Sequence, residues 1–230
     1  MTKPMDEIKD RVAAVVVTYN REEMLRQCLV SLQKQTMPCD ILVVDNASTD
    51  DTQALVQRAA QHDASIFYRN TGENLGGAGG FNFGMRWAVE AGYAFVWVMD
   101  DDCFPEPVAL EKLLDADRLL QGEYGWLSSV ALWTDGRECR MNRPKIKKSF
   151  YDRIELLRDG ILLAEQATFV SLFLKAETIR AVGLPVKEFF IWGDDIEYTR
   201  RITIREKMSC YVVGQSRVIH ACLLYTSDAA

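Results

Sequence analysis

The sequence predicts an α/β fold built on a mostly parallel sheet. Short β-branched runs alternate with amphipathic helical stretches in the first half of the 230-residue chain, and this βαβα order is typical of a parallel sheet covered by helices. Polar residues follow the early strands, and ligands of such sheets bind at the carboxyl ends of the strands. With 48% hydrophobic residues, the chain can bury the core of a single domain.

The apolar pattern places the elements of the first half. Strands are expected at residues 12–17, 41–44, 65–68 and 94–99. After the first strand, one helical face is apolar: Met24, Leu25, Cys28, Leu29 and Leu32. The segment 48–51, Ser-Thr-Asp-Asp, has the pattern of a capping box that begins a second helix. A third apolar stripe ends at Gly92: Phe81, Gly84, Met85, Ala88 and Val89. A fourth helix should follow Pro105.

The second half is expected to be mixed. Residues 126–133 and 168–174 have the composition of strands, and residues 195–207 that of a helix. The segment 137–148 is basic and contains a proline, which predicts a loop.

Composition and charge exclude several classes of protein. A net charge of -6 and a pI near 5.1 argue against nucleic acid as a general partner. No apolar run reaches the roughly 18 residues of a membrane span, and the N-terminal segment lacks the apolar region of a signal peptide. The six cysteines are scattered without zinc-like spacing. We therefore expect reduced thiols in a cytosolic protein.

Three consecutive aspartates, Asp100, Asp101 and Asp102, end the apolar run 94–99. Like charges at the end of a buried strand repel one another unless a cation neutralises them. Carboxylate oxygens suit Mg²⁺ or Mn²⁺, which would in turn hold the phosphates of a nucleotide. The alternative is a solvated turn that caps the next helix, and the other motifs of the chain favour the metal.

Two neighbouring strands are each followed by a polar segment, Thr18-Tyr-Asn-Arg21 and Asp45-Asn-Ala-Ser48. Such groups could form a pocket for a base and a ribose. Ordinary loop chemistry explains them equally well, because Asn, Asp and Ser are common in turns. Both interpretations stay open on the residues alone.

The glycine-rich segment 74–80, Asn-Leu-Gly-Gly-Ala-Gly-Gly, precedes the third predicted helix. Glycines let a backbone approach a phosphate closely, and a helix N-terminus favours negative charge. The segment is neither a P-loop nor GxGxxG, since no Gly-Lys-Ser/Thr follows and position 82 is Asn. A bound ligand or tightly packed backbone is favoured over a flexible turn.

Two acids, Asp194 and Asp195, open the last predicted helix behind the aromatic segment 189–192. A carboxylate there could accept a proton from a hydroxyl group as a general base, or simply cap the helix. Trp192 favours the first interpretation, because an aromatic face beside carboxylates suits a sugar ring. His220 could complete a metal site with two aspartates, although a lone histidine is more often structural.

Together these motifs resemble the family 2 glycosyltransferases of GT-A fold, and among them the bacterial galactofuranosyltransferases and related rhamnosyltransferases. The segments that carry the resemblance are VVVTYNRE (15–22), LVVDNASTD (42–50), NLGGAGGF (74–81), MDDD (99–102), ALWTDGR with MN.P (131–144), FFIWGDDIEYTRR (189–201) and His220. They follow the family order over nearly the whole chain. ALWTDG and GGAGGF favour the galactofuranosyl branch.

The resemblance implies a role for each motif. The nucleotide would contact Thr18, Asn20, Arg21 and Asp45, and the ribose and diphosphate would contact Asn74, Gly76 and Gly77. The metal ligands would be Asp100, Asp102 and His220, with Asp101 facing the donor sugar. Asp195 would be the catalytic base, and the acceptor would be positioned by Trp192, Asp194 and Glu197.

The implied reaction is a single inverting displacement. Asp195 deprotonates an acceptor hydroxyl, this oxygen attacks the anomeric carbon, and Mn²⁺ or Mg²⁺ stabilises the departing nucleotide diphosphate. The donor would be a UDP- or dTDP-linked galactofuranose or rhamnose-like sugar, and the acceptor a glycan or lipid-linked glycan. The protein would be cytoplasmic, with a peripheral contact at the inner face of the cell membrane as a further option.

Two other functions stay open. A sugar-phosphate nucleotidyltransferase also combines an α/β fold with acidic metal ligands, but its GxGTR-type loop is not matched by TYNRE at 18–22. A truncated fragment could bind the donor without transferring it, because the family usually continues past the metal-binding histidine. The basic segment 137–148 could contact an acidic acceptor or an anionic membrane, or be a solvated loop.

We expect one domain at residues 1–221, with a nucleotide-sugar half at about 1–105 and an acceptor and catalytic half at 106–221. Residues 222–230 look like the translated reading of a transposon-end sequencing adapter. Cys222 and the residues after it are therefore not expected to be native. A natural stop codon after Ala230 in the source locus would contradict this expectation.

Overall fold

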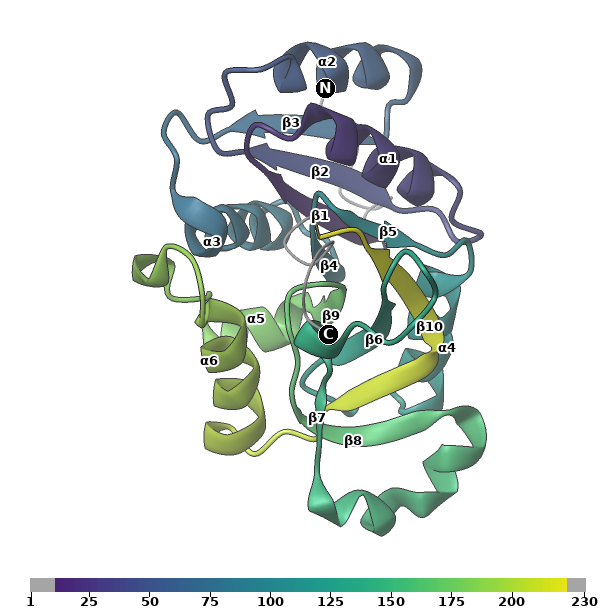
Figure 1. Ribbon diagram of the computed structural model, residues 1–230. Helices are drawn as coiled ribbons and strands as arrows, with labels where there is room; N and C mark the ends of the chain where they lie inside the picture. Colours follow the sequence, from purple (N-terminus) through teal and green to yellow (C-terminus); the bar gives the residue numbers. More distant parts are fainter. Residues whose placement is uncertain (1–10, 223–230) are drawn as a thin grey trace, which may run out of the picture.

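A computed structural model describes residues 11–222 of the chain, and within them the strands form one ten-stranded sheet (Figure 1). The strand order is β3-β2-β1-β4-β9-β6-β10-β8-β7, and β5 pairs with β10. The strands are β1 (Val12–Thr18), β2 (Asp40–Asp45), β3 (Ile66–Asn70), β4 (Phe95–Asp100), β5 (Cys103–Pro105), β6 (Leu127–Leu132), β7 (Lys145–Ile146), β8 (Ile161–Gln166), β9 (Leu172–Lys175) and β10 (Tyr211–His220). The interpretation of residues 223–230 lies outside the described residues.

The longer helices connect these strands. They are α1 (Glu22–Gln33), α2 (Thr52–His62), α3 (Gly76–Glu90), α4 (Ala109–Leu119), α5 (Ala176–Val182) and α6 (Asp194–Arg200). Shorter or irregular helical segments are η2 (Arg140–Asn142), η3 (Lys148–Asp159), η4 (Lys187–Phe189) and η5 (Arg201–Arg205). No helix in the range 11–222 combines the length and the apolar character that a membrane span needs.

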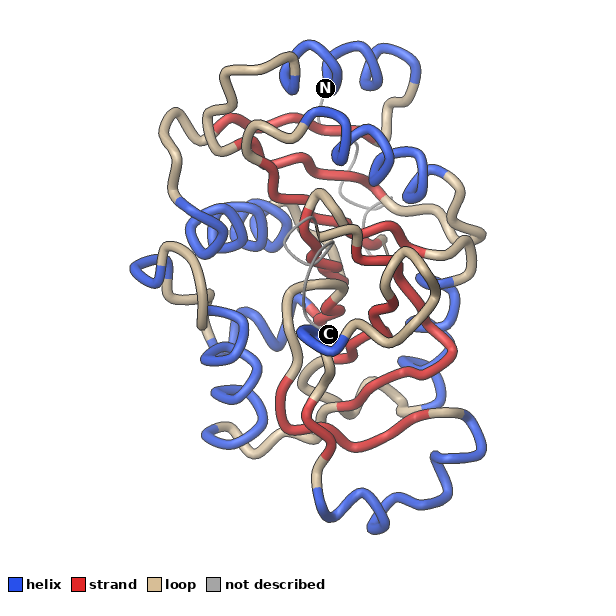
Figure 2. Tube along the Cα trace, viewed as in Figure 1, coloured by secondary structure: helices blue, strands red, loops and turns tan. Residues whose placement is uncertain are grey.

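The first half is the predicted parallel sheet covered by helices. β1 lies between β2 and β4 and is parallel to both, and β3 is parallel to β2. Alternate residues of β1 point to opposite faces. Val16 packs into the core that contains α1, α2 and α4, and Val15 into the core that contains α3. Helices therefore cover both faces of the sheet (Figure 2).

The second half is mixed, as predicted. β9 is antiparallel to β4 and to β6, and β10 is parallel to β6 but antiparallel to β8 and β5. The pairing of β10 with the short β5 sets His220 opposite Cys103. It therefore brings the histidine next to the aspartates that end β4.

The glycine-rich segment differs from the prediction. α3 begins at Gly76, so most of the glycines belong to the helix and do not precede it. A Cβ on Gly80 would lie 2.5 Å from Cγ1 of Val17, and a Cβ on Gly84 would lie 2.4 Å from Cγ1 of Val15. The glycines thus let α3 pack closely on β1, which agrees with the tightly packed backbone considered above.

The capping box expected at 48–51 does not form, although α2 follows it. Asp51, the N-cap residue, makes no side-chain cap hydrogen bond. Asp50 instead accepts hydrogen bonds from the backbone N–H groups of Thr52 and Glu22. A contact with α1 therefore replaces the reciprocal cap.

Other predicted elements in the second half are shorter than expected. The helix expected at 195–207 is divided into α6 and the π-helix η5. The hydroxyl of Thr203 donates to the carbonyl of Thr199 at 2.8 Å and competes there with regular helical bonding. Only β9 forms from the strand expected at 168–174, because Ser171 has φ +74° and interrupts the extended backbone. The loop expected at 137–148 contains η2 and β7.

Candidate active site

A cavity of about 420 Å³ lies at the carboxyl end of β4. Four aspartates line it, Asp100 and Asp102 from the aspartate triplet and Asp194 and Asp195 from the start of α6. Its other lining residues include Arg21, Gly77, Asn142, Thr168, Trp192 and His220. Residues from distant motifs therefore meet where ligands of parallel sheets bind.

Arg21 holds two aspartates of the triplet together. Its Nη1 donates to Asp101 Oδ1 at 3.0 Å and to Asp102 Oδ2 at 2.7 Å. Thr18 Oγ1 donates to the other oxygen of Asp101 at 2.7 Å. Thus Asp101 is held by two side chains near the end of β1, and Arg21 supplies one positive charge to a cluster of carboxylates.

Burial and mutual repulsion perturb the acids of this cluster. Burial raises the pKa of Asp100 well above its ordinary value, and the nearby carboxylates of Asp102 and Asp101 raise it further. Burial also raises the pKa of Asp101 to about 6, against the opposing effects of Arg21 and Thr18. Carboxylates crowded in this way favour the binding of a further cation.

His220 lies at the end of β10, beside the triplet. Its Nε2 is 3.1 Å from Asp102 Oδ1, and both side chains are buried. Apart from this imidazole nitrogen, Asp102 Oδ1 has no polar partner among the described residues. Asp102, His220 and Cys222 each offer a ligand atom, and these atoms lie within 4.8 Å of one another. The predicted ligands Asp102 and His220 are therefore adjacent, and Asp100 lines the same cavity.

The second acidic pair begins α6. Burial and the charge of Asp195 raise the pKa of Asp194 to about 6. Burial raises the pKa of Asp195 too, although backbone N–H groups, that of Ile196 first among them, partly oppose the rise. Trp192 lies on the cavity wall and is 71% exposed. A carboxylate with a raised pKa, next to an exposed aromatic ring, is suited to act as a general base toward a sugar hydroxyl.

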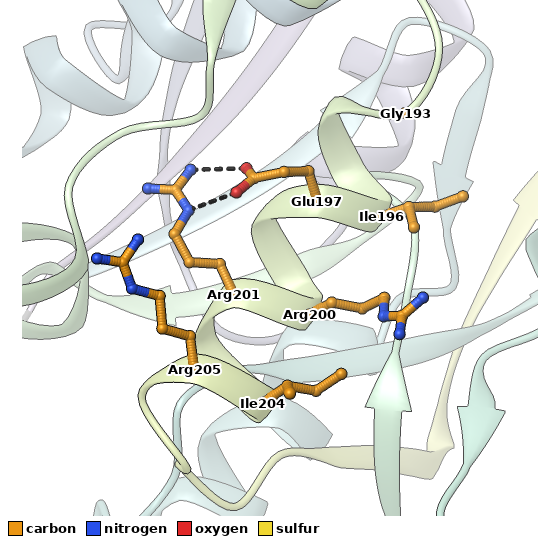
Figure 3. A pocket seen from close by; sticks show the side chains of 7 residues that line it. All are labelled: Gly193, Ile196, Glu197, Arg200, Arg201, Ile204 and Arg205. Atoms are coloured by element: carbon orange, nitrogen blue, oxygen red, sulfur yellow. Dashed lines mark hydrogen bonds and ion pairs between the residues drawn. The ribbon is translucent and has the colours of Figure 1, made fainter.

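Glu197 pairs with Arg201 and does not line the cavity. Its two carboxylate oxygens accept hydrogen bonds from Nε and Nη2 of Arg201, each at 2.8 Å. Figure 3 shows this pair on a separate groove along α6 and η5, where Arg205 extends on the same side as Arg201. Glu197 is therefore held by Arg201 and is not among the residues that line the cavity with Asp195.

The loops after β1 and β2 are joined by hydrogen bonds. Asn20 Oδ1 accepts a hydrogen bond from the backbone N–H of Thr49 at 2.7 Å, and Ser48 Oγ accepts one from the backbone N–H of Asn20. Asp45 is fully buried and accepts hydrogen bonds from the hydroxyl of Tyr68 at 2.6 Å and from the backbone N–H of Ser48. In this structure Asn20 and Asp45 hold the shape of the loops.

The start of α3 supports the aromatic segment before α6. Gly76 has φ +70°, and a Cβ there would lie 2.1 Å from the carbonyl oxygen of Phe190. Asn74 Oδ1 accepts a hydrogen bond from the backbone N–H of Gly76 at 2.9 Å. Gly77 lines the cavity and has open space where a Cβ would be.

Asn142 lies in the site without having received a role from the sequence. It is on η2, and its Oδ1 is 2.7 Å from Nδ1 of His220. Its position in the segment MN.P is the only sequence signal, and neither charge nor spacing distinguishes it there. The fold brings it to His220 through the pairing of β10.

Solved structures of similar shape define the fold. A crystal structure of GalNAc-T7 with UDP, GalNAc and Mn²⁺ superposes with a TM-score of 0.78 over 96% of this chain and 44% of that chain, at 14% sequence identity. A crystal structure of S. aureus TarS superposes with a TM-score of 0.67 over 92% of this chain and 37% of that chain, at 18% identity. The α/β architecture predicted from the sequence is thus confirmed as the GT-A fold of glycosyltransferases.

Sequence relatives define the family. Residues 13–119 match Glycosyl transferase family 2. Galactofuranosyltransferase GlfT1 of Mycolicibacterium smegmatis is 30% identical over 92% of this chain and 71% of its own length. Undecaprenyl-phosphate mannosyltransferase of Micrococcus luteus is 32% identical over 83% of this chain and 77% of its own length. The chain belongs to the family 2 glycosyltransferases, and it is a sugar-transferring enzyme.

Proposed function

We propose that the chain is an inverting, metal-dependent glycosyltransferase that moves a sugar from a nucleotide diphosphate to a hydroxyl of a glycan or lipid-linked glycan. One observation carries the proposal. Asp102 Oδ1 and His220 Nε2 lie 3.1 Å apart in the cavity that also contains Asp195. Such a transfer requires two features: a pair of metal-binding atoms and a separate buried base.

The donor set fits a divalent cation. Asp100, Asp102 and His220 would hold Mn²⁺ or Mg²⁺, because carboxylate oxygens and an imidazole nitrogen suit these ions. Asp102 Oδ1 is buried and, among the described residues, its polar partner is Nε2 of His220 at 3.1 Å, so two potential ligand atoms already lie side by side. The bound cation would stabilise the charge of the departing nucleotide diphosphate.

Asp195 is proposed as the catalytic base. It takes the proton of the acceptor hydroxyl while that oxygen attacks the anomeric carbon from the face opposite the nucleotide, and the configuration therefore inverts. Burial, which raises its pKa, makes the carboxylate a stronger base. Asp194 and Trp192 would position the acceptor sugar, with the exposed indole ring against a sugar face.

The donor would lie between the triplet and the glycine-rich start of α3. Arg21 and Gly77 line the cavity and would contact the diphosphate side directly, while Asp101 would face the sugar. The remaining donor residues, Thr18, Asn20, Asp45, Asn74 and Gly76, would shape or contact the nucleotide and ribose site. The nucleotide is proposed as UDP or dTDP.

The sugar is proposed as galactofuranose or a rhamnose-like hexose, a choice supported by the similarity to GlfT1. The similarity to undecaprenyl-phosphate mannosyltransferase supports a lipid-linked acceptor. The site of action is proposed as cytoplasmic, near the membrane. In the basic segment 137–148, however, Arg143 pairs with Glu138 and Lys145 pairs with Glu165. If vesicle binding is unchanged when Lys145, Lys147 and Lys148 are replaced, this segment makes no membrane contact.

The test is a thermal melt with UDP or dTDP, in the presence of Mn²⁺ or of EDTA. We expect one nucleotide to raise the Tm only with the metal, and Asp102→Ala to abolish that shift. Asp195→Asn should keep the shift but lose transfer, by about 10²- to 10⁴-fold. Asp152→Asn is the matched control and should leave both unchanged, because Asp152 is exposed and does not line the cavity.

Two experimental outcomes would contradict the proposal, and each would support a different function. Release of pyrophosphate from a nucleoside triphosphate and a sugar phosphate would indicate a nucleotidyltransferase. Donor binding in calorimetry without transfer to any glycan or lipid-linked glycan would indicate a donor-binding fragment.

A further inference from the structure

Asn142 contacts the ring nitrogen of His220 that faces away from Asp102. Its side-chain Oδ1 lies 2.7 Å from His220 Nδ1, and both residues are buried. The backbone N–H of Asn142 donates to the carbonyl of Cys139 at 3.1 Å within the turn η2. The amide is therefore fixed from its own backbone as well as from the imidazole.

Two further contacts set which end of the amide faces the imidazole. Asn142 Nδ2 donates to Thr168 Oγ1 at 3.1 Å, and the thiol of Cys139 donates to Asn142 Oδ1 at 3.0 Å. In the reverse orientation the NH₂ group would face the sulfur of Cys139, which is a weak acceptor. Both contacts thus favour the oxygen on the His220 side.

This orientation determines the tautomer of the histidine. An amide oxygen only accepts hydrogen bonds, so His220 Nδ1 must carry the proton. In the neutral imidazole Nε2 then has a lone pair, directed toward Asp102 Oδ1 at 3.1 Å.

We infer that Asn142 is a positioning residue that holds His220 in the Nδ1–H tautomer and so presents Nε2 as a ready ligand for the divalent cation. Partners of this kind commonly orient a metal-binding histidine through its other nitrogen. Thr168 and Cys139 act behind Asn142, because they hold its amide. The binding of a metal to Nε2 rests on the proposed function, whereas the assignment of the tautomer does not.

The chain has only two histidines, which makes the tautomer directly observable. Long-range ¹H–¹⁵N correlation spectra of the labelled full chain, without metal and at a pH where imidazole is neutral, report both rings. We expect His220 to show a protonated Nδ1 and an unprotonated Nε2. His62, exposed at the end of α2, is the internal reference.

Three variants separate the positioning role from general packing. Asn142→Ala should move the proton of His220 toward Nε2, because the acceptor at Nδ1 is gone. Asn142→Asp should keep the wild-type pattern, because a carboxylate oxygen also accepts. Cys139→Ala should keep it too, because Thr168 still holds the amide. If Asn142→Ala does not fold, Thr168→Val releases the same amide and should give a mixture of tautomers.

Mn²⁺ affinity, followed by electron paramagnetic resonance, is the second readout. Asn142→Ala should weaken binding by about 10- to 100-fold, and Asn142→Asp should recover most of it. An Nε2–H tautomer in the wild type, or an unchanged tautomer in Asn142→Ala, would overturn the inference. Wild-type protein with the expected tautomer but no Mn²⁺ binding would overturn the proposed metal site and leave the role of Asn142 in the tautomer standing.

Discussion

The backbone N–H of Ala78 donates a hydrogen bond to the carbonyl of Phe190 at 3.1 Å. The bond ties the first turn of α3 to the aromatic segment 189–192, which leads to the acidic pair at the start of α6. Phe190 itself has φ +58°, a conformation that is uncommon for an aromatic residue. The α3 wall of the cavity and the wall formed by the segment before α6 are therefore joined through this contact.

Gly76→Ala should break this connection. A methyl group at position 76 would meet the Phe190 carbonyl at 2.1 Å, and the backbone there has φ +70°. We expect a loss of about 1–3 kcal/mol in the free energy of unfolding, together with reduced transfer activity, because Trp192 would shift with its segment. Urea unfolding and the initial rate of transfer measure the two effects.

Gly77→Ala is the control for that substitution. It adds the same methyl group to the neighbouring position, where the structure has open space. Its stability should stay within about 0.5 kcal/mol of the wild type. Equal losses in the two variants would show that the contact with Phe190 does not decide the stability of this turn.

Arg21→Ala should destabilise the metal-free protein. It leaves Asp101 and Asp102 without their shared guanidinium, and we expect a loss of about 1–3 kcal/mol. Mn²⁺ should restore part of it, because a bound cation neutralises the same carboxylates. Arg26→Ala removes an arginine that pairs with Glu22 on the surface and should change stability by less than about 1 kcal/mol. Equal losses in both variants, with no recovery in Mn²⁺, would contradict this role.

The parallel half of the fold could be predicted because its strands are apolar on both faces and its helices have one apolar face. β5 and β8 could not be predicted in the same way. β5 has three residues, too few for any periodicity, and it forms because β10 pairs with it. The order of strands in the second half depends on such distant pairing and not on local pattern.

The residues of the site also differ in whether a local sequence pattern could predict them. Asp100 and Asp102 could be singled out as candidates because three acids at the end of an apolar run are unusual, and Asp195 because it begins a helix after Trp192. The role of Asn142 could not be predicted, since it depends on the contact of η2 with β10. The resemblance placed Glu197 with Trp192 and Asp194 around the acceptor; in the structure it pairs with Arg201 and is not among the residues that line the cavity.

Asp194→Asn should stabilise the protein at neutral and alkaline pH. The folded-state pKa of Asp194 is raised to about 6 from the ordinary 3.8, so the folded state binds a proton more tightly than the unfolded chain. The stability of the wild-type protein therefore falls as the pH rises from about 4 to 6. The variant lacks this carboxyl group and does not lose that stability. The gain should approach about 2–3 kcal/mol above pH 7 and vanish near pH 4.

Urea unfolding across this pH range measures the difference between the two proteins. Asp152→Asn, at an exposed position, is the control and should show no such pH dependence. A constant difference for Asp194→Asn at every pH would mean that lost contacts, and not the buried charge, set its stability.

Asp195→Asn and Glu197→Gln remove neighbouring negative charges with opposite expected results. Asp195 lines the cavity, and its amide variant should lose transfer by about 10²- to 10⁴-fold while folding normally. Glu197 is held by Arg201 on the other groove, so Glu197→Gln should keep the transfer rate within about twofold and cost about 1 kcal/mol of stability or less. Release of nucleotide diphosphate from the preferred donor, with a lipid-linked glycan as acceptor, gives both rates. A large rate loss in Glu197→Gln would restore this residue to the acceptor site and would require α6 to turn when the acceptor binds.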